Sequence, residues 1–164
     1  MRNPLLLTSL LLVASALQAA EVAAKYACPA SLSPERLTKA FIDRGFIGKA
    51  AYTNEDSISY FAAQPGATAF GFPLVAVASF EEGSSFFGRV PGTSPGNRFA
   101  LVVQAGEWQV KQAALAQKLS VSTQGSQSYP QLRIESFSNS YPEPLPKAAN
   151  PRYVYTQVLC LPRV

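Results

Sequence analysis

Residues 68–80, with the sequence TAFGFPLVAVASF, contain the strongest structural signal in the chain. Apolar side chains at every second position predict a half-buried β-strand. The face they share consists of Phe70, Phe72, Leu74, Ala76, Ala78 and Phe80. Such a face needs a second layer of structure to cover it. Pro73 has no N–H to give to a neighbouring strand, which predicts an edge position or a β-bulge at this point.

The first twenty residues have the composition of a cleavable signal peptide. Arg2 precedes an apolar core at residues 5–17, and small residues follow at 14, 16, 19 and 20. A retained membrane anchor is the alternative, but the apolar run is shorter than the roughly 20 residues of a spanning helix. We therefore predict a leader over residues 1–20, a single exported domain over residues 21–164, and a periplasmic or secreted location.

Cys28 and Cys160 lie near the two ends of this exported domain. In an oxidising compartment they predict one disulfide, and closing so long a loop stabilises the fold by up to about 4–5 kcal/mol. A reactive or metal-binding thiol pair is the alternative. The chain has no histidine and no C-x-x-C motif, so we predict neither a metal site nor a cofactor.

The N-terminal part of the domain predicts one helix and two strands. Ser33 is a suitable N-cap, Pro34 suits the first helical position, and apolar residues then recur at helical spacing up to Gly45. Residues 46–52 and 57–63 have the composition of strands, separated by a turn at residues 53–56. After the strand at 68–80, residues 82–85 predict a tight hairpin turn and residues 86–90 a returning strand.

The C-terminal part predicts further strands. Alternation predicts a strand at residues 99–103, and Trp108 and Val110 fit its continuation after a turn at 105–106. Residues 111–119 fit either a helix or a strand. Short strands are predicted at 132–136 and 152–161, with a proline-rich connection between them. The expected fold is α+β and mainly β: one antiparallel sheet or sandwich, with one N-terminal helix packed on it, closed by the terminal disulfide.

Residues 92–96 (GTSPG) match the G-x-S-x-G pattern of hydrolases. A nucleophile elbow needs a strand before the serine and a helix after it, whereas Pro95 follows Ser94 here. No histidine is present to serve as the base. The acidic pairs at 55–56 and 81–82 are adjacent residues that point to opposite faces of a strand, so neither pair is a carboxylate dyad. We therefore expect no enzymatic activity.

The charge distribution argues against nucleic acid as a partner. The net charge is only +4, and the basic residues are scattered singly. Three functions remain open. The first is a bacterial envelope binding protein, specifically an inhibitor or immunity protein that blocks a periplasmic toxin or a cell-wall hydrolase. The second is a carrier of a small apolar ligand or lipid, which an open apolar pocket of several hundred Å³ would favour over the first. The third is a carboxylate-based hydrolase.

Binding residues often lie on loops held by a rigid scaffold. The loops around residues 91–97 and 123–128 are rich in glycine and hydroxyl side chains, and two tyrosines lie in polar or proline-rich segments. The predicted binding residues are Thr93, Ser94, Asn97, Gln124, Ser126, Tyr129 and Tyr141.

Overall fold

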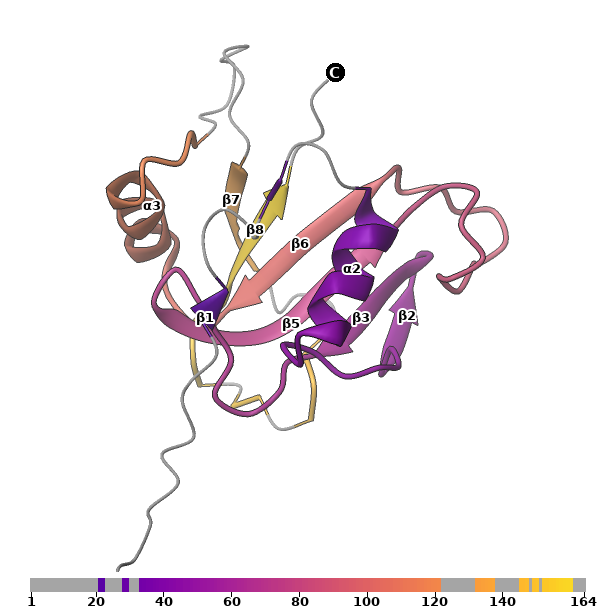
Figure 1. The fold of residues 1–164 in the computed structure, drawn as a ribbon, viewed down its shortest axis with the longest axis horizontal. Coiled ribbons are helices and arrows are strands. Elements are labelled where there is room, and N and C mark those ends of the chain that lie inside the picture. Colours follow the sequence, from indigo (N-terminus) through magenta and orange to yellow (C-terminus); the bar gives the residue numbers. More distant parts are fainter. Residues whose placement is uncertain are drawn as a thin grey trace, which may run out of the picture.

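A computed structural model of the protein describes residues 21–22, 28–29, 33–121, 132–137, 145–147, 149–150 and 152–160. These residues form an eight-stranded sheet and two helices (Figure 1). The strands are β1 (Glu21–Val22), β2 (Thr53–Glu55), β3 (Ile58–Ala62), β4 (Thr68–Ala69), β5 (Phe72–Phe80), β6 (Arg98–Val103), β7 (Leu132–Ser136) and β8 (Thr156–Cys160). The helices are α2 (Pro34–Asp43) and α3 (Glu107–Ala116).

The sheet has the order β1-β4-β5-β6-β8-β7, and β3 pairs with both β2 and β5. All of these pairs are antiparallel except β1 and β4, which run parallel, so the sheet is mixed and the expectation of a purely antiparallel sheet is wrong. The Glu21 carboxylate explains how so short a strand is held. It accepts hydrogen bonds from the Thr68 hydroxyl and, at 3.2 Å, from the backbone N–H of Gly71.

Helix α2 forms where its capping residues predict it. Ser33 Oγ accepts a hydrogen bond from Arg36 N, and Pro34 is the first helical residue. The buried side of the helix packs on β5 and β6, where the Phe41 ring lies 5.2 Å from the ring of Phe99. In Figure 1, α2 crosses in front of these two strands.

The prediction of a single helix is wrong, because residues 107–116 form α3. Trp108 and Val110, which fitted a strand, belong to this helix, and the ambiguous residues from Lys111 onward continue it. Gly106 is the N-cap residue of α3. Its N–H donates to Gln109 Oε1 at 3.0 Å and so gains a partner at the helix start. Val110 and Ala114 are fully buried in the same core as α2, beside β7.

The stretch at 68–80 is a hairpin rather than one strand. Phe70 and Gly71 have φ angles of 58° and 80°, and they form a two-residue turn between β4 and β5. A bulge follows, because Leu74 pairs with Val103 and Ala76 with the adjacent Val102. Of the two alternatives that Pro73 predicted, an edge position is wrong, because β5 is a central strand, and a bulge occurs directly after Pro73, between Leu74 and Ala76. It also turns Leu74 and Ala76 to opposite faces, so the single predicted apolar face is wrong.

Two further predicted strands are absent from the described residues. Within 46–52 only Ile47 makes an isolated bridge, to Ala63, and the strand follows at β2. Residues 86–90 are irregular. Their backbone groups form hydrogen bonds with side chains and not with a neighbouring strand. Val90 N donates to Ser57 Oγ at 2.8 Å, and Asn54 Nδ2 donates to the Gly88 carbonyl at 3.0 Å.

The two ends of the domain are joined by the predicted disulfide between Cys28 and Cys160. Both cysteines pack against the main core, and Cys160 lies at the end of β8. The last strand begins later than predicted, because among the described residues from 152 to 160 only 156–160 pair with β6 and β7. Neither described helix has the length and apolar composition needed to cross a membrane.

Candidate functional site

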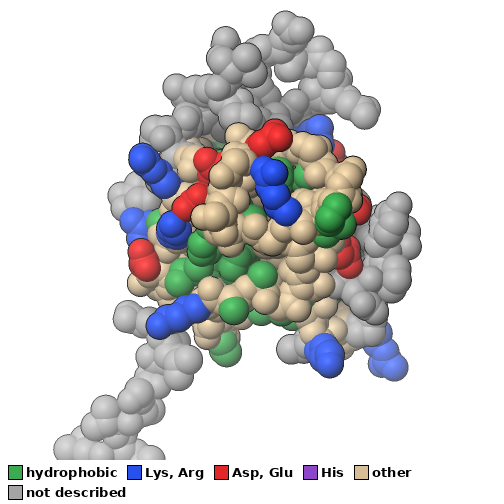
Figure 2. Space-filling model, turned by 90° about the vertical axis from the view of Figure 1, so that its right-hand side faces the viewer, with side chains coloured by type: hydrophobic (Ala, Val, Ile, Leu, Met, Phe, Trp, Pro, Cys, Tyr) green, Lys and Arg blue, Asp and Glu red, His purple; other side chains and the backbone are tan. Residues whose placement is uncertain are grey.

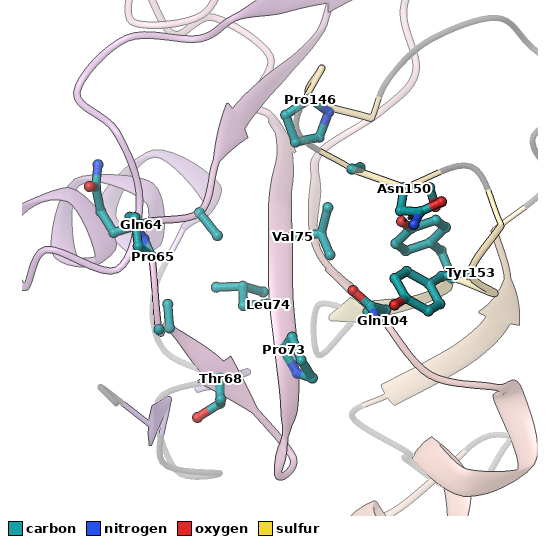
Figure 3. Close-up of a pocket in the computed structure, with 15 residues that line it drawn as sticks. Gln64, Pro65, Thr68, Pro73, Leu74, Val75, Gln104, Pro146, Asn150 and Tyr153 are labelled. Atoms are coloured by element: carbon teal, nitrogen blue, oxygen red, sulfur yellow. Dashed lines mark hydrogen bonds between the residues drawn. The ribbon is translucent and has the colours of Figure 1, made fainter. Parts of the chain in front are cut away.

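A cleft of about 550 Å³ opens at the end of the sheet where β5 begins. One wall is the chain between β3 and β4, from Ala63 to Thr68. The floor is the first part of β5 around Val75, and the opposite wall contains Gln104 and residues from the segment before β8. Figure 3 shows Pro65 on the first side, Leu74 and Val75 in the middle, and Asn150 and Tyr153 on the other.

The first wall and the floor are fixed by backbone hydrogen bonds. Gly66, with a φ of 81°, allows the tight turn in which Ala67 N donates to the Gln64 carbonyl at 3.1 Å. Leu74 N donates to the Ala67 carbonyl at 2.9 Å, and Ala63 N to the Val75 carbonyl at 3.0 Å. The bulge therefore keeps its hydrogen bonds while its extra residue, Val75, faces the cleft.

The second wall is organised around Asn150. The Asn150 carbonyl accepts from the Tyr155 hydroxyl at 2.7 Å and from Tyr153 N at 3.1 Å. Its side-chain Oδ1 accepts from Arg152 N at 3.0 Å. A short turn is thus pinned to β8 through Tyr155, which is only 2% exposed, and Tyr153 remains half exposed at the cleft.

Among the described residues, the lining is largely apolar and carries no charged side chain. Its polar side chains are Gln64, Thr68, Gln104, Asn150, Tyr153 and Tyr155. Burial raises the pKa of Tyr155, while its hydrogen bond to Asn150 acts in the opposite direction. The hydroxyl therefore stays protonated as a structural donor. The lining offers no carboxylate, amine or imidazole for acid–base chemistry, and it suits the binding of an uncharged molecule.

A second polar grouping lies on the sheet face turned away from α2. Burial lowers the pKa of Arg98 and raises that of Tyr60, and the two side chains partly offset these shifts in each other. Arg98 Nε is buried with no hydrogen-bond partner among the described residues. Tyr60 pairs with Ala78 and Arg98 with Phe80 on the adjacent strand β5, and both of these β5 side chains are buried.

The predicted binding residues that the structure describes lie elsewhere, in the loop that follows the other end of β5. Thr93 Oγ1 is 2.7 Å from Ser57 Oγ, and Asn97 Oδ1 accepts from Glu82 N at 2.8 Å, so both have partners within the fold. Ser94 is exposed. The other predicted binding residues, Gln124, Ser126, Tyr129 and Tyr141, lie outside the described residues.

Figure 2 looks onto the side of the molecule where this loop lies in Figure 1. Lysine, arginine and acidic side chains are intermixed on it, around one area where hydrophobic side chains gather. A surface with both signs of charge lacks the single-sign field that attracts nucleic acid. Among the described residues, no group of His, Cys, Asp and Glu is arranged to hold a metal ion.

The sequence analysis did not single out the cleft, because its walls come from segments about 80 residues apart. Two signals were available locally. Pro65-Gly66 indicated the turn, and Pro73 indicated the bulge. Comparison with known protein families, curated proteins and solved structures finds no match to this chain.

Proposed function

We propose that the protein is an exported, non-catalytic binding protein of the bacterial envelope, and that it holds a small, uncharged, largely apolar ligand in this cleft. The observation that carries the proposal is the open cleft of about 550 Å³, whose lining within the described part of the chain includes no charged residue. Ligand sites commonly have volumes of about 300–1,000 Å³, with mainly apolar walls and a few polar groups. This cleft has both properties.

The chemistry of the walls supports binding rather than catalysis. Leu74, Val75 and Pro146 offer aliphatic surface, and Tyr153 offers an aromatic ring that is half exposed. Transfer of an apolar ligand from water to such a surface is favourable by about 25 cal/mol for each Å² buried. A charged ligand would lose its hydration without gaining an ion pair, so the cleft selects against it.

The test is titration of the full exported domain with diphenylhexatriene, a neutral hydrocarbon whose fluorescence rises in apolar surroundings. We expect saturable binding by the wild type and much weaker binding by Val75→Glu, which places a carboxylate in the floor. Val90→Glu is the matched control, because Val90 is 37% exposed and lies outside the cleft lining. Thermal midpoints of both variants separate lost binding from lost folding.

Equal binding by Val75→Glu and Val90→Glu would place the dye elsewhere on the molecule and contradict the proposal. Absence of saturable binding by the wild type would also contradict it. A folded Val75→Glu variant that loses the dye, beside a Val90→Glu variant that keeps it, is the supporting result.

A second candidate function is an inhibitor or immunity protein that acts by protein–protein contact. The observation in its favour is α3, where Trp108 is 72% exposed and Leu115 is 53% exposed. Seven residues are about two helical turns, so both side chains lie on one side of the helix, opposite buried Val110 and Ala114. Tryptophan is one of the residue types enriched at the energetic centres of interfaces.

This candidate is tested by affinity capture from envelope extracts with wild type and with Trp108→Ala/Leu115→Ala. Loss of the same captured protein in the double variant supports contact through α3. Replacing Ser94 with a bulky charged residue tests the loop at 91–97 in the same assay. Capture that survives both changes would contradict a role for either surface.

A further inference from the structure

We propose that the cleft recognises a neutral amide, so that its ligand is an uncharged, peptide-like molecule with aliphatic side groups rather than a fatty acid or a plain hydrocarbon. This inference rests on the proposed binding function and specifies the class of ligand. It depends on the carboxamide groups of Gln104 and Asn150, which lie on the same side of the cleft (Figure 3).

Asn150 has one hydrogen-bonding group left over. Its carbonyl accepts from Tyr155 and Tyr153, and its Oδ1 accepts from Arg152 N. These contacts fix the orientation of the side chain, because an exchange of the two amide ends would place N–H against N–H. Nδ2 then has no partner among the described residues, and Asn150 lines the cleft. It is a pre-positioned donor for a carbonyl oxygen.

Gln104 adds both a donor and an acceptor on the same wall. Its backbone N–H donates to the Pro73 carbonyl at 2.9 Å, so the position of the residue next to the bulge is fixed. Its side-chain amide has no hydrogen-bond partner among the described residues and also lines the cleft. A peptide group offers one N–H and one C=O, and a carboxamide can satisfy both.

The remaining lining separates this class from the alternatives. An ionised fatty acid needs a cation, and none of the lining residues that the structure describes is Lys or Arg. A hydrocarbon would displace water from Gln104 and Asn150. The two carboxamides would lose their hydrogen bonds to water and gain none in return, which costs free energy. A neutral amide avoids both losses, and its aliphatic groups can pack on Leu74 and Val75.

The experiment compares N-acetyl-Leu-Leu-amide with N-acetyl-Leu-Leu, which carries an ionised carboxylate at pH 7. Calorimetric titration of the full exported domain should show tighter binding of the amide, by about tenfold or more. Gln104→Met removes the carboxamide but keeps the length and apolar stem of the side chain. It should weaken amide binding about three- to tenfold, as expected for one net hydrogen bond, and it should not weaken diphenylhexatriene binding.

Two further variants complete the design. Asn150→Asp keeps the acceptor for Arg152 N but replaces the free donor with an oxygen, so it should weaken amide binding as well. Gln112→Met is the matched control, because Gln112 is exposed on α3 and lies outside the cleft lining. This variant should change the affinity for neither the amide nor diphenylhexatriene.

Equal affinity for the amide and the acid would overturn the inference, as would unchanged amide binding in both Gln104→Met and Asn150→Asp. If diphenylhexatriene binds and the amide does not, the ligand class is wrong while the proposed function stands. If neither binds, both are wrong.

Discussion

The contact between α2 and the sheet includes a buried pair of hydroxyl groups whose removal has a calculable effect on stability. Thr38 Oγ1 lies 2.9 Å from Ser79 Oγ and 2.8 Å from the Pro34 carbonyl. Ser79 Oγ also lies 3.2 Å from the Arg98 carbonyl. Thr38 and Ser79 are both completely buried, so water cannot replace a lost partner.

Thr38→Val keeps the side-chain volume and removes the hydroxyl. It should lower the free energy of unfolding by about 0.5–1.5 kcal/mol, the net contribution of a hydrogen bond, because Ser79 Oγ keeps the Arg98 carbonyl as a partner. Ser79→Ala should have a similar effect. The double variant should lose less than the sum of the two, by about 0.5–1 kcal/mol, because the Thr38–Ser79 contact is then removed only once.

Urea unfolding of the four proteins, followed by circular dichroism, measures this coupling. The slope of the unfolding free energy against urea concentration should agree among the variants, so that differences in the midpoint concentration report stability alone. Single-variant effects that add within about 0.3 kcal/mol would refute the pairing, because independent sites behave in that way. A Thr38→Val variant as stable as the wild type would refute the argument from burial.

Four other outcomes are expected. Replacing Cys28 and Cys160 with serine should lower stability by about 2–5 kcal/mol in urea unfolding, and two alkylatable thiols in the native protein would contradict the disulfide. Burial raises the pKa of Tyr60 above 10.0 in the fold, so the unfolded chain loses this proton first and stability should fall as the pH rises above about 10. Tyr60→Phe should flatten that loss in pH-dependent unfolding. The single tryptophan, Trp108, should emit as a solvated indole and be readily quenched by acrylamide, whereas blue-shifted emission would contradict an exposed α3 surface. N-terminal sequencing of envelope protein should begin between residues 17 and 21, and an intact Met1 in a membrane fraction would contradict a cleaved leader.

The predictable parts of the fold are those where local chemistry and tertiary structure agree. Ser33 and Pro34 predict the start of α2, because an N-cap residue and a first-turn proline favour a helix through interactions within the first turn itself. The disulfide followed from two cysteines and a presumed oxidising compartment. For α3, the sequence left residues 111–119 open between helix and strand and assigned Trp108 and Val110 to a strand. Trp108 and Leu115 make the outer side of the helix apolar as well, which removes the one-sided pattern of an amphipathic helix.

The hairpin between β4 and β5 shows tertiary structure overriding local preference. A phenylalanine rarely adopts a positive φ, and only Gly71 signalled a turn at this point. Phe70 nevertheless has a φ of 58° while its side chain is only 3% exposed. Burial of a large aromatic ring, favourable by about 1.5–3 kcal/mol, offsets the 1–3 kcal/mol cost of the backbone conformation.

The cleft follows from the same segment of chain. Pro73 cannot donate to the ladder, and one residue is inserted at the bulge that follows it, where Val75 turns into the cleft. The Pro73 carbonyl, still available, binds Gln104 N and holds the residue whose carboxamide lies on the second wall. Pro73 thus lines the cleft beside Leu74 and Val75, and its carbonyl helps to place one polar group. The sequence indicates the bulge, but the identity of the residues opposite it depends on how β6 and the segment before β8 return to this end of the sheet.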